Sequence, residues 1–283
     1  MSKIRRVGFV IKPHAPGVEA VLSGLMDYLE EKGVSSVLED AAARKLGRAR
    51  GVAREALPER VELVVVLGGD GTLLSVAHKA AKAGVPVMGV NLGRLGFLTE
   101  IPVGEARLTL DSMLMGEAER IISPRRLIEA CSRRKVHLCL NDVVINKGAL
   151  SRMIQIAIRI DGKEIAVLKA DGVIVSTPTG STAYSLAAGG PIVQPWVPAV
   201  VLSPICPHTL TFRPMVISEG STIRLKLLTD GEKVFLTLDG QRGGRLEKND
   251  EVEVRTSPLE LKLVTSPRRN YFDLVKEKLG WAG

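Results

Sequence analysis

The chain has 283 residues, 45% hydrophobic and 25% charged, a balance typical of a globular protein with one large domain or two of ordinary size. Its net charge of +8 suits polyanionic partners such as nucleotides, but the few aromatic residues and the lack of a dense Lys/Arg block argue against nucleic-acid binding. No apolar run approaches the ~18 residues that span a bilayer, and the N-terminal residues resemble a first strand rather than a signal peptide. We therefore expect a cytoplasmic protein that binds no membrane.

The first 115 residues alternate between strand and helix patterns. Each expected strand is almost entirely apolar, which indicates a parallel sheet covered on both faces. Apolar residues at helical spacing separate these strands. The predicted strands are 7–11, 61–67 and 85–91, and the predicted helices are 18–32, 73–83 and 104–117.

After about residue 120 the apolar period changes to two, which indicates antiparallel sheet with one face buried. Asp161-Gly162 and Asp230-Gly231 supply turn residues between the strands. The last stretch, 270–281, has apolar residues on one helical face. The three cysteines, which lack metal or redox spacing, are expected to be reduced core residues: Cys131, Cys139 and Cys206. The alternating runs lie at 154–160, 223–227, 234–238, 252–254 and 259–263.

The most informative segment is VELVVVLGGDGTLL, residues 61–74. A buried strand that breaks into a glycine turn and then a helix is the usual phosphate site of α/β proteins. A carboxylate there repels phosphate unless it takes a proton or holds a metal ion, so Asp70 is a candidate general base or metal contact. The alternative is an ordinary turn with Asp70 as the helix N-cap. The segment is neither a Walker A loop nor a dinucleotide fingerprint.

Two further segments are rich in polar groups. Residues 171–193 contain hydroxyls suited to phosphate or ribose oxygens, and Ser181 or Thr182 is expected to cap a helix at 183–188. Residues 140–146 place Asn141 and Asp142 beside an apolar run, where a carboxylate and an amide suit ribose hydroxyls. The alternatives are a capped helix after a strand and an Asx turn at a strand start.

Together these segments resemble the NAD kinase family over nearly the whole chain. The matching motifs are GGDGT at 68–72, Asn141-Asp142 and the TPTGSTAYS segment at 177–185, joined by NLGRLGFL, PHTLTFRP and LDGQ. The resemblance implies a Rossmann-like α/β domain at 1–118 and a mainly antiparallel, β-sandwich-like NAD-binding domain at 119–264. It also implies that residues 265–283 pack back on the first domain.

The resemblance also implies a role for each matching residue. Asp70 would take the proton from the adenosine 2′-hydroxyl of NAD, and a neighbouring subunit would supply some contacts to the same ligand. The glycine turn for the phosphoryl donor would be Gly68, Gly69, Gly71 and Thr72. The NAD contacts would be Asp70, Gly71, Asn141, Asp142, Arg152, Lys169, Asp171, Thr182, Ala183, Tyr184, Ser185, Leu186, Ala187 and Gln241.

The expected reaction transfers the terminal phosphoryl group of ATP or inorganic polyphosphate to NAD, giving NADP. Mg²⁺ or Mn²⁺ is expected on the donor phosphates rather than on protein side chains. A homo-oligomer, a dimer or tetramer, is also expected. Two alternatives remain open: a lipid kinase of the diacylglycerol or sphingosine type, which shares the GGDG turn, and a non-catalytic dinucleotide sensor.

Overall fold

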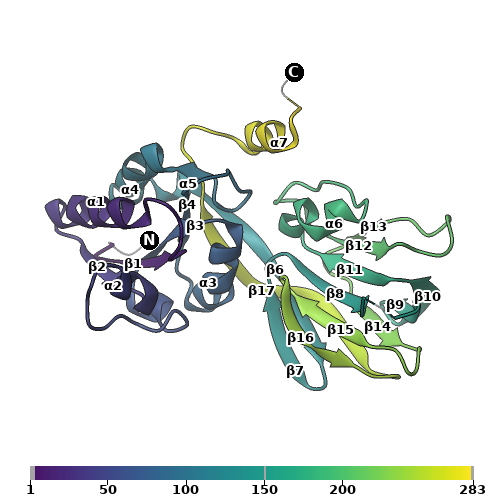
Figure 1. The fold of residues 1–283 in the computed structure, drawn as a ribbon. Coiled ribbons are helices and arrows are strands. Elements are labelled where there is room, and N and C mark those ends of the chain that lie inside the picture. The colour runs from purple at the N-terminus through teal and green to yellow at the C-terminus, as the bar shows by residue number, and fades with distance from the viewer. Residues whose placement is uncertain (1–3, 150, 282–283) are drawn as a thin grey trace. The chain divides into compact units, whose positions relative to one another are not determined.

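The structure, a computed structural model, describes residues 4–149 and 151–281. The chain forms two compact units, Met1–Pro124 with Leu261–Gly283, and Arg125–Glu260 (Figure 1). The domain limits at residues 118 and 264, which were inferred from the sequence, remain a prediction. Among the described residues, no helix has both the length and the apolar character needed to cross a membrane.

The first unit is an α/β layer structure. Its sheet has the strand order β2-β1-β3-β4, with the end of β17 beside β4, and these neighbours are parallel. The elements in chain order are β1 (Arg6–Ile11), α1 (Val18–Glu31), β2 (Ser35–Leu38), α2 (Asp40–Lys45), η1 (Leu57–Arg60), β3 (Leu63–Gly68), α3 (Asp70–Ala83), β4 (Val87–Asn91), β5 (Ile101–Pro102), η2 (Val103–Glu105), α4 (Ala106–Leu114), α5 (Ala118–Ile121) and the C-terminal α7 (Tyr271–Leu279).

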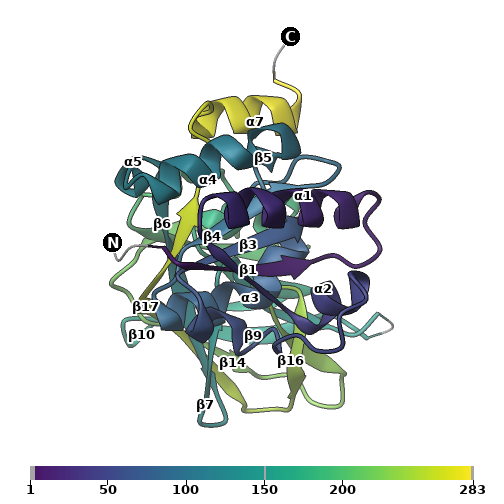
Figure 2. The same cartoon turned by 90° about the vertical axis from the view of Figure 1, so that its left-hand side faces the viewer.

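Helices cover both faces of this sheet, as the apolar strands predict. Helices α1 and α4 lie on one face and α3 on the other (Figure 2). All six residues of β3 are buried. Leu22 and Leu29 of α1 share one core with Phe9 of β1 and Val65 of β3. Burial on both faces is what makes the strand sequences continuously apolar.

The strand order places the glycine turn at the reversal point of the sheet. Strand β1 lies between β2 and β3. The chain therefore goes from β1 to β2 on one side and then crosses to β3 on the other side of β1. Ligands of open α/β sheets bind beyond the carboxyl ends of strands at such a point. Ile11 and Gly68 are the last residues of the two central strands, and Asp70 begins the helix that follows.

The second unit is a sandwich of two sheets around one apolar core. One sheet has the order β13-β12-β11-β8-β15-β16, and the other joins β10, β9, β14 and β17, all antiparallel. Ile145 and Val175 of the first sheet share a core with Ile156 and Leu225 of the second. The elements are β6 (Ile122–Ser132), β7 (Lys135–Cys139), β8 (Asp142–Lys147), β9 (Ile154–Ile160), β10 (Lys163–Ala170), β11 (Gly172–Ser176), η3 (Thr179–Thr182), α6 (Tyr184–Ala187), β12 (Ala199–Ile205), β13 (Met215–Ser218), β14 (Ile223–Leu227), β15 (Val234–Leu238), β16 (Gln241–Leu246) and β17 (Glu251–Val264).

Three expectations need correction. The two alternating runs at 252–254 and 259–263 form a single strand, β17, which continues through Pro258. Both Asp-Gly pairs lie between strands as expected: Asp161-Gly162 forms the β9–β10 hairpin turn, and Asp230-Gly231 connects β14 and β15, which belong to different sheets. The helix expected at 104–117 is a short 3-10 turn followed by α4. Cys206 is exposed rather than part of a core, although Cys139 is buried.

A buried ion pair supports the first unit beneath the glycine turn. Glu39 is 2% exposed and accepts from Ile11 N at 2.6 Å and from Arg54 Nε at 2.6 Å. Arg54 Nη1 also donates to Ser75 Oγ at 2.9 Å, and that hydroxyl donates to the carbonyl of Thr72 at 2.6 Å. This chain of bonds joins the end of β1 to the first turn of α3.

Replacing Arg54 with Met should destabilise the protein because it leaves the Glu39 carboxylate buried without its cation. We expect a loss of about 3 kcal/mol, at the low end for such pairs because Arg54 is partly exposed. Urea unfolding of Arg54→Met and of the exposed control Arg60→Met measures the difference. Equal midpoints for the two variants would contradict this role of the ion pair.

Candidate functional site

Asp70 begins α3, and a separate loop holds its carboxylate. The N-cap residue of α3 is Gly69, which has an extended backbone. No side chain forms a cap hydrogen bond at this helix end. Asp70 Oδ2 accepts from Phe97 N at 2.9 Å, whereas Oδ1 accepts from Leu98 N at 3.1 Å and from both N and Oγ1 of Thr99 at 2.9 Å. The interpretation of Asp70 as an N-cap is therefore wrong. Its side chain is oriented by tertiary contacts from residues 97–99, the end of the NLGRLGFL segment and the threonine that follows it.

Glycines allow this close approach. A Cβ on Gly96 would lie 2.0 Å from Asp70 Oδ1, so only glycine fits there. At Gly69 and Gly71, in contrast, a Cβ would meet nothing within 4 Å, and neither residue has positive φ. Protein packing therefore does not require these two glycines, and the space beside them is open. That arrangement suits the approach of a phosphate or ribose to the turn.

In the second unit, Asp239 fixes the segment that contains Asn141 and Asp142. Its carboxylate accepts backbone N–H bonds from Leu140 at 2.8 Å, Asn141 at 2.7 Å and Asp142 at 3.1 Å. The backbone N–H of Asp239 donates to the carbonyl of Asp142 at 3.0 Å. These bonds account for the polar backbone where β8 begins.

The TPTG turn packs on the same segment. Thr177 Oγ1 donates to the carbonyl of Leu140 at 2.6 Å and accepts from Gly180 N at 3.0 Å. A Cβ on Gly180 would lie 2.0 Å from the carbonyl oxygen of Asn141, so this glycine is required by contact. The hydroxyls of Ser176 and Thr179 are buried and have no hydrogen-bond partner within the described chain. Buried hydroxyls without a partner are uncommon, so these two have hydrogen-bonding capacity left for a polar ligand or a water molecule.

Burial and a second carboxylate change the ionisation of Asp142. This side chain is 4% exposed, opposite Ser176 in the β8–β11 register. Burial, and then the nearby Asp239, raise the pKa of Asp142 to about 7. Burial also raises the pKa of Asp239, although its three backbone N–H bonds act in the other direction. A carboxyl group that titrates near neutrality among polar groups is a frequent feature of binding and catalytic sites.

The other predicted contacts of this unit lie elsewhere. Asp171 forms an ion pair with Lys147 at 3.4 Å, at the end of β8 and β11 opposite to Asp142. Lys147 lies five residues along β8 from Asp142, about 17 Å at roughly 3.3 Å per residue. Arg152 and Lys169 are exposed, the latter on β10. The structure therefore does not bring these three predicted residues to the Asn141–Asp142 group within one chain.

The predicted adenine segment, Thr182–Ala187, follows the TPTG turn. It is not the capped helix that the sequence suggested, because Ser181 and Thr182 donate back to Pro178 and Thr179 carbonyls and cap nothing. The helical part is only α6. Ser185 is buried against Ser203 at 3.0 Å, whereas Tyr184 is exposed. Gln241 is exposed and pairs across the Asp239 turn with Leu238.

Sequence reasoning missed two residues. Asp239 stands in the LDGQ motif, but its contacts are about 100 residues away along the chain, so no local pattern identifies its role. Lys12 directly follows β1 and lies next to the glycine turn. A Cβ built on Gly68 would lie 3.1 Å from the Cβ of Lys12. This exposed cation stands beside the glycine turn, where only the strand order could place it.

The protein groups at Asp70 fit an ion held by phosphates better than an ion held by side chains. Both Asp70 oxygens already accept hydrogen bonds. Among the described residues, no three His, Cys, Asp or Glu side chains cluster closely enough to hold a metal ion. A divalent cation at this turn would therefore take most of its ligands from water and phosphate oxygens, as Mg²⁺ commonly does.

Known proteins match both units. The ATP-NAD kinase N-terminal domain matches residues 7–118, and the ATP-NAD kinase C-terminal domain matches residues 140–266. The NAD kinases of Trichlorobacter lovleyi and Geobacter sulfurreducens are 46% and 43% identical, over 98% of this chain and 99% of each relative. The crystal structure of yeast NADH kinase complexed with NADH aligns with a TM-score of 0.89 at 28% identity, over 100% of this chain and 89% of that one.

An NAD kinase from Archaeoglobus fulgidus in complex with ATP shares the fold, with a TM-score of 0.77 at 23% identity, over 98% of this chain and 100% of that one. The α/β domain and the antiparallel β domain expected from the sequence are thereby confirmed. Because the two domain matches span most of the sequence and full-length relatives exceed 40% identity, this chain belongs to the NAD kinase family.

Proposed function

We propose that the chain transfers the terminal phosphoryl group of ATP or inorganic polyphosphate to the adenosine 2′-hydroxyl of NAD, with Asp70 as the general base. The observation that carries the proposal is the position of Asp70. A carboxylate stands at the first turn of a helix, beyond a buried strand, beside two glycines with open space around them. A hydroxyl needs such a base, whose effect is typically about 10²–10⁴-fold.

Hydrogen bonds to Asp70 support this role because they fix the carboxylate without neutralising it. Phe97, Leu98 and Thr99 donate from neutral groups, so they hold the side chain in one orientation and place no counter-charge beside it. Oδ2 accepts one of these bonds, and a carboxylate oxygen has room for a second donor. A ribose hydroxyl would supply that second donor and pass its proton to Oδ2 as the phosphoryl group arrives.

The Asn141–Asp142 group would hold the ribose. The unpartnered hydroxyls of Ser176 and Thr179 and the buried carboxyl of Asp142 supply hydrogen-bonding capacity that the protein itself does not use. The hydroxyl-bearing segment up to Ala187 would line the adenosine pocket, and Gln241 would close it. Orientation of both substrates should contribute more to the rate than the base alone.

A divalent metal ion, Mg²⁺ or Mn²⁺, would neutralise charge on the donor phosphates. The glycine turn, Gly68 to Thr72, would bind those phosphates through backbone N–H groups, with Lys12 as an additional cation. These residues bind and orient the donor, whereas Asp70 receives the proton.

The polar second unit favours a dinucleotide over a lipid acceptor. A lipid kinase needs an apolar acceptor site, yet the buried groups next to Asn141 are hydroxyls and a carboxyl. A sensor without catalysis has no need for an acidic side chain in an anion-binding turn. Neither alternative has support from the family matches.

We also propose a cytoplasmic homo-oligomer, a dimer or tetramer. Asp171 and Lys147 lie at the far end of β8 and β11 from Asp142. This separation within one chain is expected if Asp171, Lys169 and Arg152 contact NAD bound to a neighbouring subunit. The three cysteines are free thiols, as suits a reducing compartment.

Wild-type protein with Mg²⁺ should form NADP from NAD, with ATP and polyphosphate supplied in separate reactions to identify the donor. Asp70→Asn should lower kcat by about 10²-fold or more while NAD binding stays near wild type, because the amide cannot accept the proton. Coupled spectroscopic detection of NADP measures kcat, and calorimetry measures binding. A variant that keeps most of its kcat would exclude Asp70 as the base.

NAD affinity should depend on the ionisation of Asp142. In the protein without NAD, the pKa of Asp142 is raised to about 7. Ribose hydroxyls that donate to the ionised carboxylate would lower this pKa, so NAD binding should release a proton. The Kd for NAD should therefore fall several-fold as the pH rises from about 6 to 8. Asp142→Asn should lose this dependence, and the exposed control Asp230→Asn should keep it. Equal pH dependence in wild type and Asp142→Asn would refute the assignment.

A further inference from the structure

The C-terminal helix contacts the loop that holds Asp70. The loop consists of Arg94–Thr99, and α7 lies more than 170 residues later in the same compact unit. Lys278, in the last turn of α7, donates from Nζ to the carbonyl of Leu95 at 2.6 Å. The same ammonium lies 5.6 Å from the ring centroid of Phe97. Lys278 thus contacts the residue before Gly96 and the residue after it.

Gly96 is the residue of this loop that packs most tightly on the Asp70 carboxylate. The loop cannot shift toward Asp70 there, because no room exists for even one more carbon atom. The backbone N–H of Phe97 donates to Asp70 Oδ2, the oxygen proposed to receive the proton. A displacement of Leu95 or Phe97 therefore changes the orientation of that oxygen directly.

Lys278 is directed at the loop rather than at an acid. Within the part of the chain that the structure describes, its ammonium forms no ion pair with a carboxylate. Lys276 and Lys278 both stand in the last turn of α7, but Lys276 is exposed whereas Lys278 is partly buried against the loop. A partly desolvated ammonium strengthens both a carbonyl hydrogen bond and a cation–π contact.

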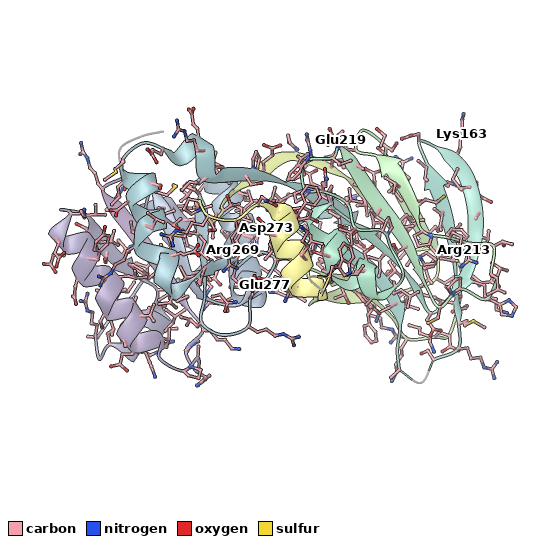
Figure 3. All side chains as sticks on the ribbon, turned by 90° about the horizontal axis from the view of Figure 1, so that it is seen from above. Lys163, Arg213, Glu219, Arg269, Asp273 and Glu277 are labelled. Carbon is pink, nitrogen blue, oxygen red and sulfur yellow. The ribbon has the colours of Figure 1, made fainter. Side chains whose placement is uncertain are left out.

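Other contacts hold α7 in place independently of Lys278. Asn270 and Asp273 form a capping box at its start, and Arg269 pairs with Glu277 along the helix at 3.1 Å (Figure 3). Leu274 and Val275 are buried. A change at Lys278 therefore leaves the helix formed and removes only its contact with the loop.

The segment that leads into α7 contacts the same region of the chain. Ser266 N donates to Glu100 Oε1 at 2.8 Å, and Ser266 Oγ donates to Glu105 Oε2 at 2.6 Å. Glu100 directly follows the loop. The C-terminal segment thus holds the Asp70-binding loop at both of its ends, through Leu95 and through Glu100.

We propose that Lys278 is a positioning residue for phosphoryl transfer: it fixes the Leu95–Phe97 turn, and thereby the orientation of the Asp70 carboxylate. This inference rests on the proposed role of Asp70 as the base. Small displacements of a reacting group can cost up to about 10²-fold in rate, so the effect should be on kcat. NAD binding, which the second unit supplies, should change little.

The test compares Lys278→Met, which keeps the aliphatic chain, with Lys278→Arg and with the matched control Lys276→Met in the full chain. Lys278→Met should lower kcat by about tenfold with KM for NAD within about twofold of wild type. Hydrogen–deuterium exchange of the Phe97, Leu98 and Thr99 amides should become about tenfold faster. Lys278→Arg keeps a donor and a cation over the ring and should restore both, and Lys276→Met should match wild type.

Unchanged kcat and amide exchange in Lys278→Met would overturn the positioning role, as would an equal loss in Lys276→Met. Asp70→Asn distinguishes this failure from failure of the proposed function. If Asp70→Asn is inactive while Lys278→Met behaves as wild type, only the role of Lys278 is wrong. If Asp70→Asn keeps its activity, the base assignment fails, and the positioning role fails with it even where loop exchange has risen.

Discussion

The first unit is organised around one half-buried carboxylate that is held in a single orientation. Asp70 stands at a helix N-terminus in a turn suited to anions, where a freely rotating carboxylate would simply cap the helix. Three successive backbone N–H groups and one hydroxyl direct it elsewhere. Those donors require a loop that passes within contact of the carboxylate, which in turn requires Gly96.

In the second unit a carboxylate also accepts several backbone N–H bonds, but here it holds the backbone in place. Asp239 accepts three successive backbone N–H bonds from residues 140–142, and so fixes the start of β8. In both units a side-chain carboxylate satisfies a run of backbone donors that no strand or helix partner reaches. In the first unit the carboxylate is the proposed reacting group, and the backbone positions it. In the second unit the carboxylate positions the backbone of Asn141 and Asp142.

The sequence predicted the fold class well because the spacing of apolar residues differs between covered parallel strands, helices and one-sided antiparallel sheets. Continuous apolar runs indicated covered parallel strands, and alternation indicated the sandwich. Motif order pointed to the glycine turn and to Asn141-Asp142. Local pattern could not reveal that Asp70 bonds to residues 97–99, or that Asp239 bonds to residues 140–142, because both contacts are set by tertiary structure. It also predicted a capped helix at 183–188, where the Ser181 and Thr182 hydroxyls instead bond back to the preceding turn.

The central claim is that the chain directs a phosphoryl group to one hydroxyl of NAD. The most direct test is the position of the new phosphate in the product made from NAD with ATP and Mg²⁺, read by phosphorus-31 NMR. If Asp70 activates the adenosine 2′-hydroxyl, the product carries a single phosphomonoester, on the adenosine 2′-oxygen. A phosphate on another ribose oxygen, or hydrolysis of ATP without any phosphorylated dinucleotide, would contradict it.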